Sequence, residues 1–348
     1  MAMTPSARAW VLDGIKGLAA LVILLHHAAS YGPLAQAWEA TTPRLSEALY
    51  DYGRMTVQVF LVAAGFLAAQ SLAQPNTPLS PHRVARLAWR RYLRLVWPLG
   101  VALLLASAMA AWSRPHLPGE DWLSEPADIG SWLSHLTLLH SVLDHEAMSA
   151  GVWYIAIDFQ LFVLMLLLHM APRVRWTQAA LVALMLASLW VFNRWPHWDD
   201  GALYFFGAYG LGACAAYARA SRRAQLWRLG MALAIAVSLL IEARWRVALA
   251  GATAGLLSVL PLQPPAPAWL SGACHWAGQR SFGLFLVHFP LLMGFSALWE
   301  RLDLPAHHVG WALLALVLLS GLLADGLWRW VERPGPPMFA HRLKPPAT

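Results

Sequence analysis

Long apolar stretches alternate with short polar connections along the chain from Trp10 to Trp330. A helix of about 20 apolar residues crosses the roughly 30 Å hydrocarbon layer of a bilayer, and most of these stretches approach that length. They lack the two-residue alternation of polar and apolar positions that is typical of strands, and helices satisfy their own backbone hydrogen bonds in lipid. The pattern therefore predicts an all-α, polytopic transmembrane helical bundle with about 10 or 11 membrane segments.

The expected segments have the approximate bounds 10–30, 55–73, 93–112, 131–143, 152–170, 177–192, 202–218, 226–241, 247–262, 281–299 and 309–330. The 131–143 segment is too short to span alone, and we expect it to enter and leave on the outer side. The first segment has no small-residue cleavage site after it, so we expect it to remain as the first helix. We interpret residues 1–334 as one transmembrane domain and residues 335–348 as a short cytoplasmic tail.

Composition supports a membrane protein, since 59% of the 348 residues are hydrophobic and only 12% are charged. This is more apolar surface than a single water-soluble core of this size would bury. The two cysteines, Cys214 and Cys274, imply neither a disulfide framework nor a metal site.

Basic residues gather in one set of loops. If the 131–143 segment re-enters, both termini share one side, and seventeen of the 25 Lys and Arg residues fall there against seven on the other side. The positive-inside rule assigns that side to the cytoplasm. The net charge of +7 thus reflects membrane topology, and we expect no nucleic-acid partner.

Ionisable groups within a spanning helix cost about 2.5–3.5 kcal/mol each, and the first helix contains Asp13, Lys16, His26 and His27. At ~100° per residue, Asp13, Lys16 and His27 share one face, whereas His26 lies roughly 80° away from Lys16. A histidine acts near neutral pH as a general base or a transient nucleophile, and His27 is the better placed of the two.

Asp13 lies about 21 Å along the helix axis from His27, too far to orient its ring. Asp158 is the other acidic residue well within a predicted span, and we expect it to contact His27. The alternative is that these polar groups only join helices through hydrogen bonds worth roughly 0.6–2 kcal/mol each.

A basic stretch precedes the third expected segment. Arg83, Arg86, Arg90 and Arg94 recur at helical spacing, with Arg91 beside them. Guanidinium groups bind phosphate in a bidentate manner, so this stretch suits the phosphates of a cytoplasmic nucleotide cofactor. Residue chemistry alone favours a simpler role as a topology anchor that touches anionic lipid headgroups.

Single histidines in apolar stretches, such as His140, His169 and His288, are more often satisfied core groups than ligands. They carry no functional assignment on their own chemistry.

Several motifs, taken together, resemble the acyltransferase 3 family, the membrane O-acyltransferases of bacterial envelope sugars. Its opening LDGxRG, followed by a histidine, is similar to Leu12–Gly17 with His27. The other matching stretches are Phe60–Leu67 to FFLxSGFL, Arg90–Pro98 to RRxxRxxP, Val152–Phe162 to LWxLxxExxFY, Leu286–Pro290 to YLxHxP, and Glu332–Pro334 to ERP. The order of these motifs over nearly the whole chain makes the resemblance specific.

The resemblance implies an acyl-coenzyme A donor, usually acetyl, and a hydroxyl acceptor on an extracytoplasmic glycan or related molecule. It implies a bacterial inner-membrane location, His27 as the catalytic histidine, and Arg91 and Arg94 as ligands of the coenzyme A phosphates. We assign Asp158, Asp13 and Lys16 to the catalytic group and add Arg90 and Arg86 to the phosphate ligands. We further assign Trp153, Gln160 and His288 to the acceptor site.

The chain departs from the family pattern at three positions, where Lys16 replaces arginine, Ala64 replaces serine and Asp158 replaces glutamate. Two other functional classes compete with the acyltransferase. A proton-coupled transporter would use the same ionisable residues to bind solute, but no internal repeat supports it. A non-catalytic scaffold for polymer assembly would tolerate the loss of His27.

Overall fold

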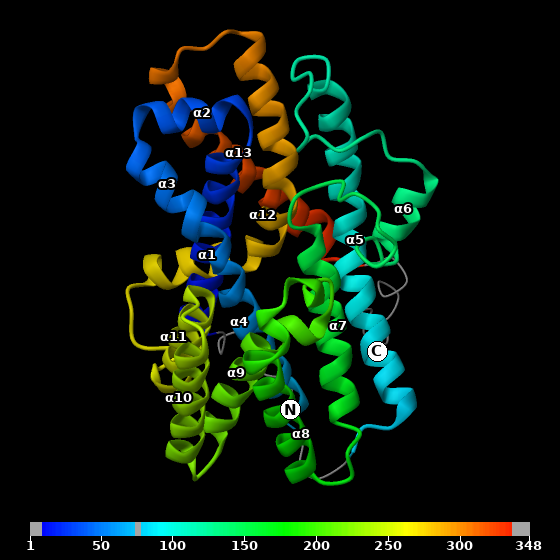
Figure 1. The fold of residues 1–348 in the computed structure, drawn as a ribbon, viewed down its shortest axis with the longest axis vertical. Coiled ribbons are helices and arrows are strands. Elements are labelled where there is room, and N and C mark those ends of the chain that lie inside the picture. Colours follow the sequence, from blue (N-terminus) through cyan, green and yellow to red (C-terminus); the bar gives the residue numbers. More distant parts are fainter. Residues whose placement is uncertain (1–8, 74–77, 336–348) are drawn as a thin grey trace, which may run out of the picture. The chain divides into compact units, whose positions relative to one another are not determined.

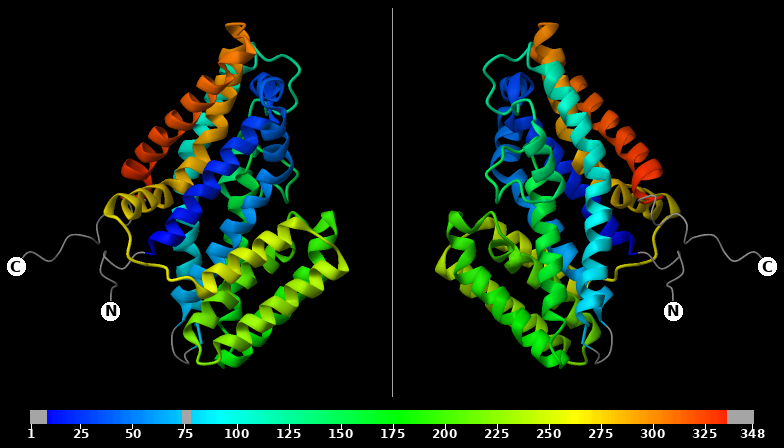
Figure 2. Two further views of the ribbon diagram at one scale, coloured as in Figure 1. Left: turned by 90° about the vertical axis from the view of Figure 1, so that its left-hand side faces the viewer. Right: turned by 90° about the vertical axis from the view of Figure 1, so that its right-hand side faces the viewer.

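The computed structural model describes residues 9–73 and 78–335, and the regular elements within these ranges are all helices (Figures 1 and 2). The expected all-α fold class is confirmed. The α-helices are α1 (Trp10–Ser30), α2 (Gly32–Thr41), α3 (Pro43–Tyr52), α4 (Val57–Leu72), α5 (Pro81–Ser113), α6 (Ile129–Leu136), α7 (Val152–Leu168), α8 (Val174–Trp190), α9 (Ala202–Ala220), α10 (Ala224–Ile241), α11 (Trp245–Val259), α12 (Ala268–Arg301) and α13 (Val309–Leu327).

Among the described residues, 7 helical stretches are long and apolar enough to cross a membrane, which makes the chain a multi-pass membrane protein. These stretches are Trp10–Ser30, Pro43–Leu72, Pro81–Ser113, Val174–Arg194, Ala224–Ile241, Ala268–Arg301 and Ala306–Glu332. The apolar helices α7 and α11 are shorter than the roughly 20 residues that span unaided. Sequence analysis expected more spans because it counted these short apolar stretches and α9 as well.

Two helices extend well beyond their apolar stretches. Helix α5 begins at Pro81 rather than near residue 93, and α12 begins at Ala268 rather than near 281. Hydropathy marks where a helix would leave lipid, whereas the helix itself continues. In α5 it continues because arginine has high helix propensity. The basic stretch therefore belongs to the same helix as the third expected span.

The region between α5 and α7 contains less helix than expected. The 131–143 segment corresponds to α6, which has 8 residues, followed by turns. Asp128 caps the start of α6, where its Oδ1 accepts a hydrogen bond from the Ser131 N–H at 2.7 Å. Leu138 has φ of 60°, a left-handed conformation that does not continue a helix. Conversely, α2 and α3 were not expected.

The described chain divides into two compact units. Unit 1 comprises the described residues within Met1–Ala19, Met55–Trp89 and Ala156–Gly278, and unit 2 comprises those within Ala20–Arg54, Arg90–Ile155 and Gln279–Thr348. The single domain over 1–334 stays a prediction, and residues 336–348 of the expected tail lie outside the described residues.

Unit 1 is organised around α9, which packs against α4, α8, α10 and α11. Helices α9, α10 and α11 follow one another through short connections and lie side by side (Figures 1 and 2). A Cβ atom on Gly65 of α4 would run into the backbone carbonyl of Tyr209, and one on Gly212 of α9 would run into that of Val62. Glycine at both positions lets the two backbones meet, which is a common way for helices to associate in lipid.

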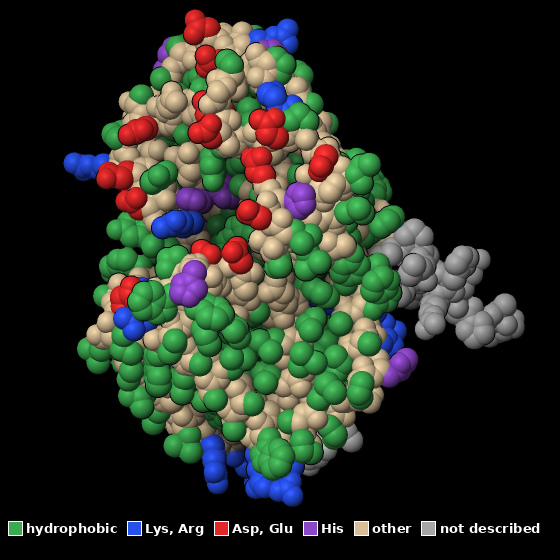
Figure 3. Space-filling view, turned by 45° about the vertical axis from the view of Figure 1, so that its right-hand side comes forward, with side chains coloured by type: hydrophobic (Ala, Val, Ile, Leu, Met, Phe, Trp, Pro, Cys, Tyr) green, Lys and Arg blue, Asp and Glu red, His purple; other side chains and the backbone are tan. Residues whose placement is uncertain are grey.

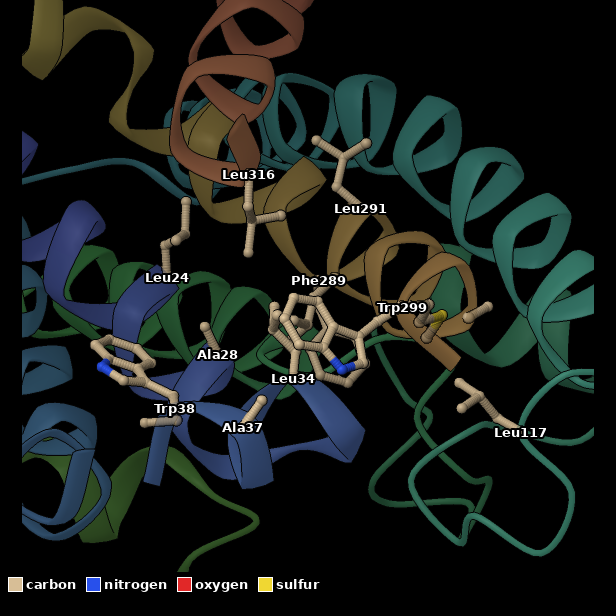
Figure 4. Close-up of a cluster of buried hydrophobic side chains, with 14 of the residues drawn as sticks. Leu24, Ala28, Leu34, Ala37, Trp38, Leu117, Phe289, Leu291, Trp299 and Leu316 are labelled. Atoms are coloured by element: carbon tan, nitrogen blue, oxygen red, sulfur yellow. The ribbon is translucent and has the colours of Figure 1, made fainter. Parts of the chain in front are cut away.

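Unit 2 has an apolar core built from the later part of α1 together with α2, α12 and α13. Leu24, Ala28 and Leu34 pack there with Phe289 and Leu316 (Figure 4). The chain turns from α1 into α2 at Gly32, whose φ of 73° favours glycine. This packing holds the residues around position 27 in a rigid setting.

We predict that Gly65→Ala and Gly212→Ala each destabilise the protein by about 1–3 kcal/mol, because the added methyl group forces α4 and α9 apart. Thermal unfolding in detergent checks this, and each variant should show a clearly lowered midpoint. Gly255→Ala in α11 is the matched control, since a Cβ atom there meets nothing within 4 Å. Equal midpoints for all three variants would contradict the tight α4–α9 contact.

Candidate active site

His27 of α1 and His288 of α12 form a buried pair in unit 2. Nδ1 of His27 lies 2.7 Å from Nε2 of His288, and the rings are stacked with centroids 5.0 Å apart. Nδ1 of His288 lies 3.0 Å from the carbonyl oxygen of Leu284, one turn earlier on α12. The structure thus places the predicted catalytic histidine next to a residue that sequence analysis had assigned to the acceptor site.

These contacts fix the tautomers of both rings. A carbonyl oxygen only accepts, so Nδ1–H of His288 donates to Leu284 and the neutral ring leaves Nε2 as an acceptor. Nδ1–H of His27 must then donate to that nitrogen, which leaves Nε2 of His27 without a proton. The arrangement produces an oriented base with its lone pair on Nε2.

Aromatic rings surround His27 on the remaining sides. Tyr31 and Phe289 meet its ring edge-on, with centroids 5.7 and 5.6 Å away. Trp122 lies beyond them, 5.9 Å from the Tyr31 ring and 6.0 Å from that of Phe289. Packed among these rings, His27 is only 9% exposed.

His26 lies beside this pair, with its ring centroid 5.2 Å from that of His27, but it is hydrogen-bonded elsewhere. Its Nδ1–H donates to the carbonyl oxygen of Leu49 at 2.9 Å, which ties α1 to α3. A Cβ atom on Gly53 would lie 2.6 Å from the Cβ of His26, so the backbone packs closely here. These contacts give His26 a packing role between α1 and α3.

Asp13 and Lys16 occupy the other end of α1, in unit 1. Nζ of Lys16 lies 2.9 Å from Oδ1 of Asp13, and Nδ1–H of His275 donates to Oδ2 at 3.0 Å. Lys16 also donates to the Gly278 carbonyl at 3.4 Å. The cluster joins the start of α1 to the start of α12, and a catalytic role for Asp13 and Lys16 stays a prediction. Sequence analysis did not identify His275.

Close backbone packing accompanies this cluster. A Cβ atom on Gly17 would lie 2.5 Å from that of Ala277, and one on Gly14 would lie 2.9 Å from Sγ of Cys274. A Cβ atom on Gly278 would collide with the backbone of Asp13. The small residues bring the ionic groups within reach of one another.

Asp158 is buried in α7 at 4% exposure and belongs to unit 1, whereas His27 belongs to unit 2. The expected contact between their side chains stays a prediction. Gln160, on the same helix, accepts a hydrogen bond from the Ala202 N–H at 3.0 Å and so caps the start of α9. Trp153 is partly buried beside Tyr154, with ring centroids 6.3 Å apart.

The basic residues proposed as phosphate ligands all lie on α5. Arg86 belongs to unit 1, while Arg90, Arg91 and Arg94 belong to unit 2. Arg94 and Arg280 both lie close enough to Glu332 for their positive charges to act on its carboxylate.

Arg280 is the centre of an ionic cluster in unit 2 that sequence analysis missed. Its Nε donates to Oδ1 of Asp325 at 2.8 Å, and Arg329 contacts Oδ2 of the same carboxylate at 2.7 Å. The Arg280 guanidinium also lies 4.0 Å from the ring centroid of Trp328. Arg280 of α12 and Asp325 near the end of α13 are thus ion-paired, and the charges of Arg280 and of Arg94 on α5 both act on Glu332.

His169 and His140, the other two single histidines in apolar stretches, differ in their hydrogen bonding. His169 is satisfied, since its Nδ1–H donates to the Met165 carbonyl at 2.7 Å. His140 is 1% exposed, and neither of its ring nitrogens has a hydrogen-bond partner among the described residues. It stacks on His135 with centroids 4.4 Å apart, and burial lowers its pKa to about 4. His140 is therefore uncharged near neutral pH.

Comparison with known proteins gives one result. A family model described as Acyltransferase domain, that of the acyltransferase 3 family, matches residues 10–325. No curated protein and no solved structure matches the chain. Among the described residues, no group of three or more His, Cys, Asp or Glu side chains is arranged to hold a metal ion.

We predict that the Asp13–Lys16 pair is strongly coupled. Asp13→Asn leaves the partly buried Lys16 ammonium without its carboxylate partner. We expect a cost of about 1–3 kcal/mol, below the roughly 3–5 kcal/mol of a fully buried pair. Lys16→Met should have a similar cost, and the double variant should cost less than the sum of the two. Unfolding midpoints of the four proteins in detergent test this cycle.

The exposed pair Arg194–Glu242 provides the control, because its side chains are 37% and 46% exposed and such pairs contribute about 0–1 kcal/mol. Arg194→Gln should leave the midpoint nearly unchanged, since Glu242 keeps its contact with Arg244 at 3.7 Å. Additive effects of the Asp13 and Lys16 substitutions would contradict the coupling.

Proposed function

The chain belongs to the acyltransferase 3 family, and from this premise we propose that it moves an acyl group, acetyl in the simplest case, from cytoplasmic acyl-coenzyme A to a hydroxyl of an extracytoplasmic carbohydrate or related acceptor. Membership of the family establishes an acyltransferase. The donor and the acceptor are the proposal, together with a location in the bacterial inner membrane and cytoplasmic termini.

The hydrogen bond from His27 to His288 is the observation that carries the mechanism. It orients the ring and leaves Nε2 as the unprotonated nitrogen, as a general base requires. Because His288 is itself held by Leu284, the orientation does not depend on the substrate.

In the proposed reaction, Nε2 of His27 removes the proton from the acceptor hydroxyl. The hydroxyl oxygen attacks the thioester carbonyl carbon, a C–O bond forms and the C–S bond breaks. The coenzyme A thiolate leaves and takes the proton back from His27. During the reaction His27 is an imidazolium, and its hydrogen bond to His288 stabilises that charge.

The proposed donor site is the basic part of α5. Arg90, Arg91 and Arg94, with Arg86 one turn before, would bind the phosphates of coenzyme A at the cytoplasmic side. The cluster around Arg280 keeps this end of unit 2 positively charged, since Asp325 is already paired with Arg280 and Arg329.

The acceptor would approach from the opposite side. His27 lies about 25 Å along α1 from Trp10, which places it near the predicted outer end of the helix. The surrounding aromatic rings suit the apolar faces of a sugar, and Trp153 remains a candidate for acceptor binding. The contacts of His288 favour a role in orienting His27.

We predict that His27→Ala lowers the release of free thiol from acetyl-coenzyme A by at least ~10²-fold, since this is the usual contribution of a general base. His288→Ala should lower kcat by about 10²-fold with an unchanged KM for acetyl-coenzyme A. His288→Gln should recover most of the loss, because the amide oxygen can accept the same hydrogen bond from His27. The assay uses purified protein in nanodiscs with an envelope-glycan extract as acceptor.

His26→Gln is the control for this series, because His26 neighbours His27 but bonds to Leu49. It should retain nearly full activity. Activity that survives His27→Ala would overturn the mechanism, and a radiolabelled acetyl group that stays on denatured protein would make His27 an acyl carrier. If the wild type neither binds nor turns over acyl-coenzyme A, the transporter alternative takes first place.

We predict that Arg91→Ala and Arg94→Ala each raise the KM for acetyl-coenzyme A by about tenfold, the equivalent of 1.4 kcal/mol of binding, with little change in kcat. Arg175→Ala, at the start of α8, is the control. With acetyl-coenzyme A that lacks the 3′-phosphate as donor, the KM values of the variants and the wild type should differ less. Unchanged KM values in both variants would leave α5 as a topology anchor.

A further inference from the structure

Unit 1 contains a cavity that the proposed reaction does not use. It has a volume of about 610 Å³, within the range of small-molecule sites, and lies among α8, α9 and α10. Its wall includes Trp190, Cys214 and Leu233 and is mainly apolar. Such a space suits a hydrocarbon chain rather than a sugar or a nucleotide.

The cavity opens among surfaces that face lipid. In the apolar 18-residue stretch of each spanning helix, only 28% of the residues of α8 and 17% of those of α10 are buried, against 72% for α12. Leu226 and Leu233 of α10 line the cavity and are 63% and 66% exposed. In a bilayer this exposure is to acyl chains, which therefore have direct access to the cavity.

One end of the cavity is polar. Gln178 lies near the start of α8, Ser221 follows the end of α9, and Arg223 precedes α10, so all three lining residues lie where these helix ends meet. Arg223 is exposed, and its guanidinium has no ion-pair or hydrogen-bond partner among the described residues. Figure 3 shows Lys and Arg side chains gathered at its lower edge, where Figure 1 places the starts of α8 and α10.

The local charge favours an anion. No acidic residue occurs between Asp158 and Asp199 or between Asp200 and Glu242. Two helices begin at this end, and the residues that precede them, Arg173 and Arg223, make no capping hydrogen bond through their side chains. Uncapped N–H groups at a helix start attract negative charge and add to the arginine.

We propose that this cavity is a binding site for an anionic phospholipid, with one acyl chain among α8, α9 and α10 and the phosphodiester on Arg223. The polar end of the cavity suits the phospholipid headgroup, and its apolar interior suits the acyl chain. On the predicted topology this end is cytoplasmic, where anionic headgroups attract basic residues.

Gly230 provides a sharp test, since it lines the cavity and a Cβ atom there meets nothing within 4 Å. Gly230→Leu should fill the space without a clash against the backbone. Gly255→Leu is the matched control, because Gly255 is also helical and open but lies outside the cavity lining. Arg223→Glu removes the headgroup contact. Arg44→Glu repeats the charge change at an exposed residue of α3 that is not part of the lining.

The experiment adds dioleoyl phosphatidylglycerol or dioleoyl phosphatidylcholine to the protein in detergent and counts bound lipid by native mass spectrometry. We expect the wild type and both controls to retain one phosphatidylglycerol in preference to phosphatidylcholine. Gly230→Leu and Arg223→Glu should each bind phosphatidylglycerol at least about tenfold more weakly. Thermal unfolding confirms that every variant is folded.

Equal retention of phosphatidylglycerol by Gly230→Leu and Gly255→Leu would overturn the site. Equal binding of the two lipids by the wild type would overturn the role of Arg223. Neither result depends on acyltransferase activity, so the two proposals can fail separately.

Discussion

A bilayer offers no hydrogen-bond partners, so an ionisable side chain within a spanning helix is costly unless the protein supplies its partner. That constraint explains the arrangement on α1, where Asp13 and Lys16 bond to each other and to residues of α12, and His27 bonds to His288. The partners on α12 all lie more than 260 residues later in the chain than the α1 residues that they contact. The polar groups that the chemistry needs thus also determine which helices meet.

Small residues make these meetings possible. Where α1 and α12 begin, Gly14, Gly17 and Gly278 allow contacts that a larger side chain would prevent, and Gly65 and Gly212 do the same for α4 and α9. Close approach raises the van der Waals contact that drives helix association in lipid, where no hydrophobic force between helices operates. The glycines in this chain therefore help to determine its fold as much as its apolar residues do.

Sequence patterns predicted the all-α fold and the bounds of α1, because an uninterrupted apolar run is a strong local signal. They placed the starts of α5 and α12 too late, since hydropathy falls where a helix leaves lipid although the helix continues. Helices α2 and α3 were missed because they are short and have mixed polarity. Helical geometry selected His27 over His26, but no local signal could reveal that His288 is its partner, because the contact joins distant segments.

The hydrogen-bonded chain from His27 ends at the carbonyl oxygen of Leu284. A peptide carbonyl does not take up a proton and pass it on. His27 can therefore hold a proton, but these hydrogen bonds do not carry it further. A proton that enters at Nε2 of His27 has to leave from the same atom. The histidine pair therefore provides no proton pathway through α12. This suits a group-transfer reaction in which His27 takes up a proton and then returns it, and the pair itself does not conduct protons across the membrane.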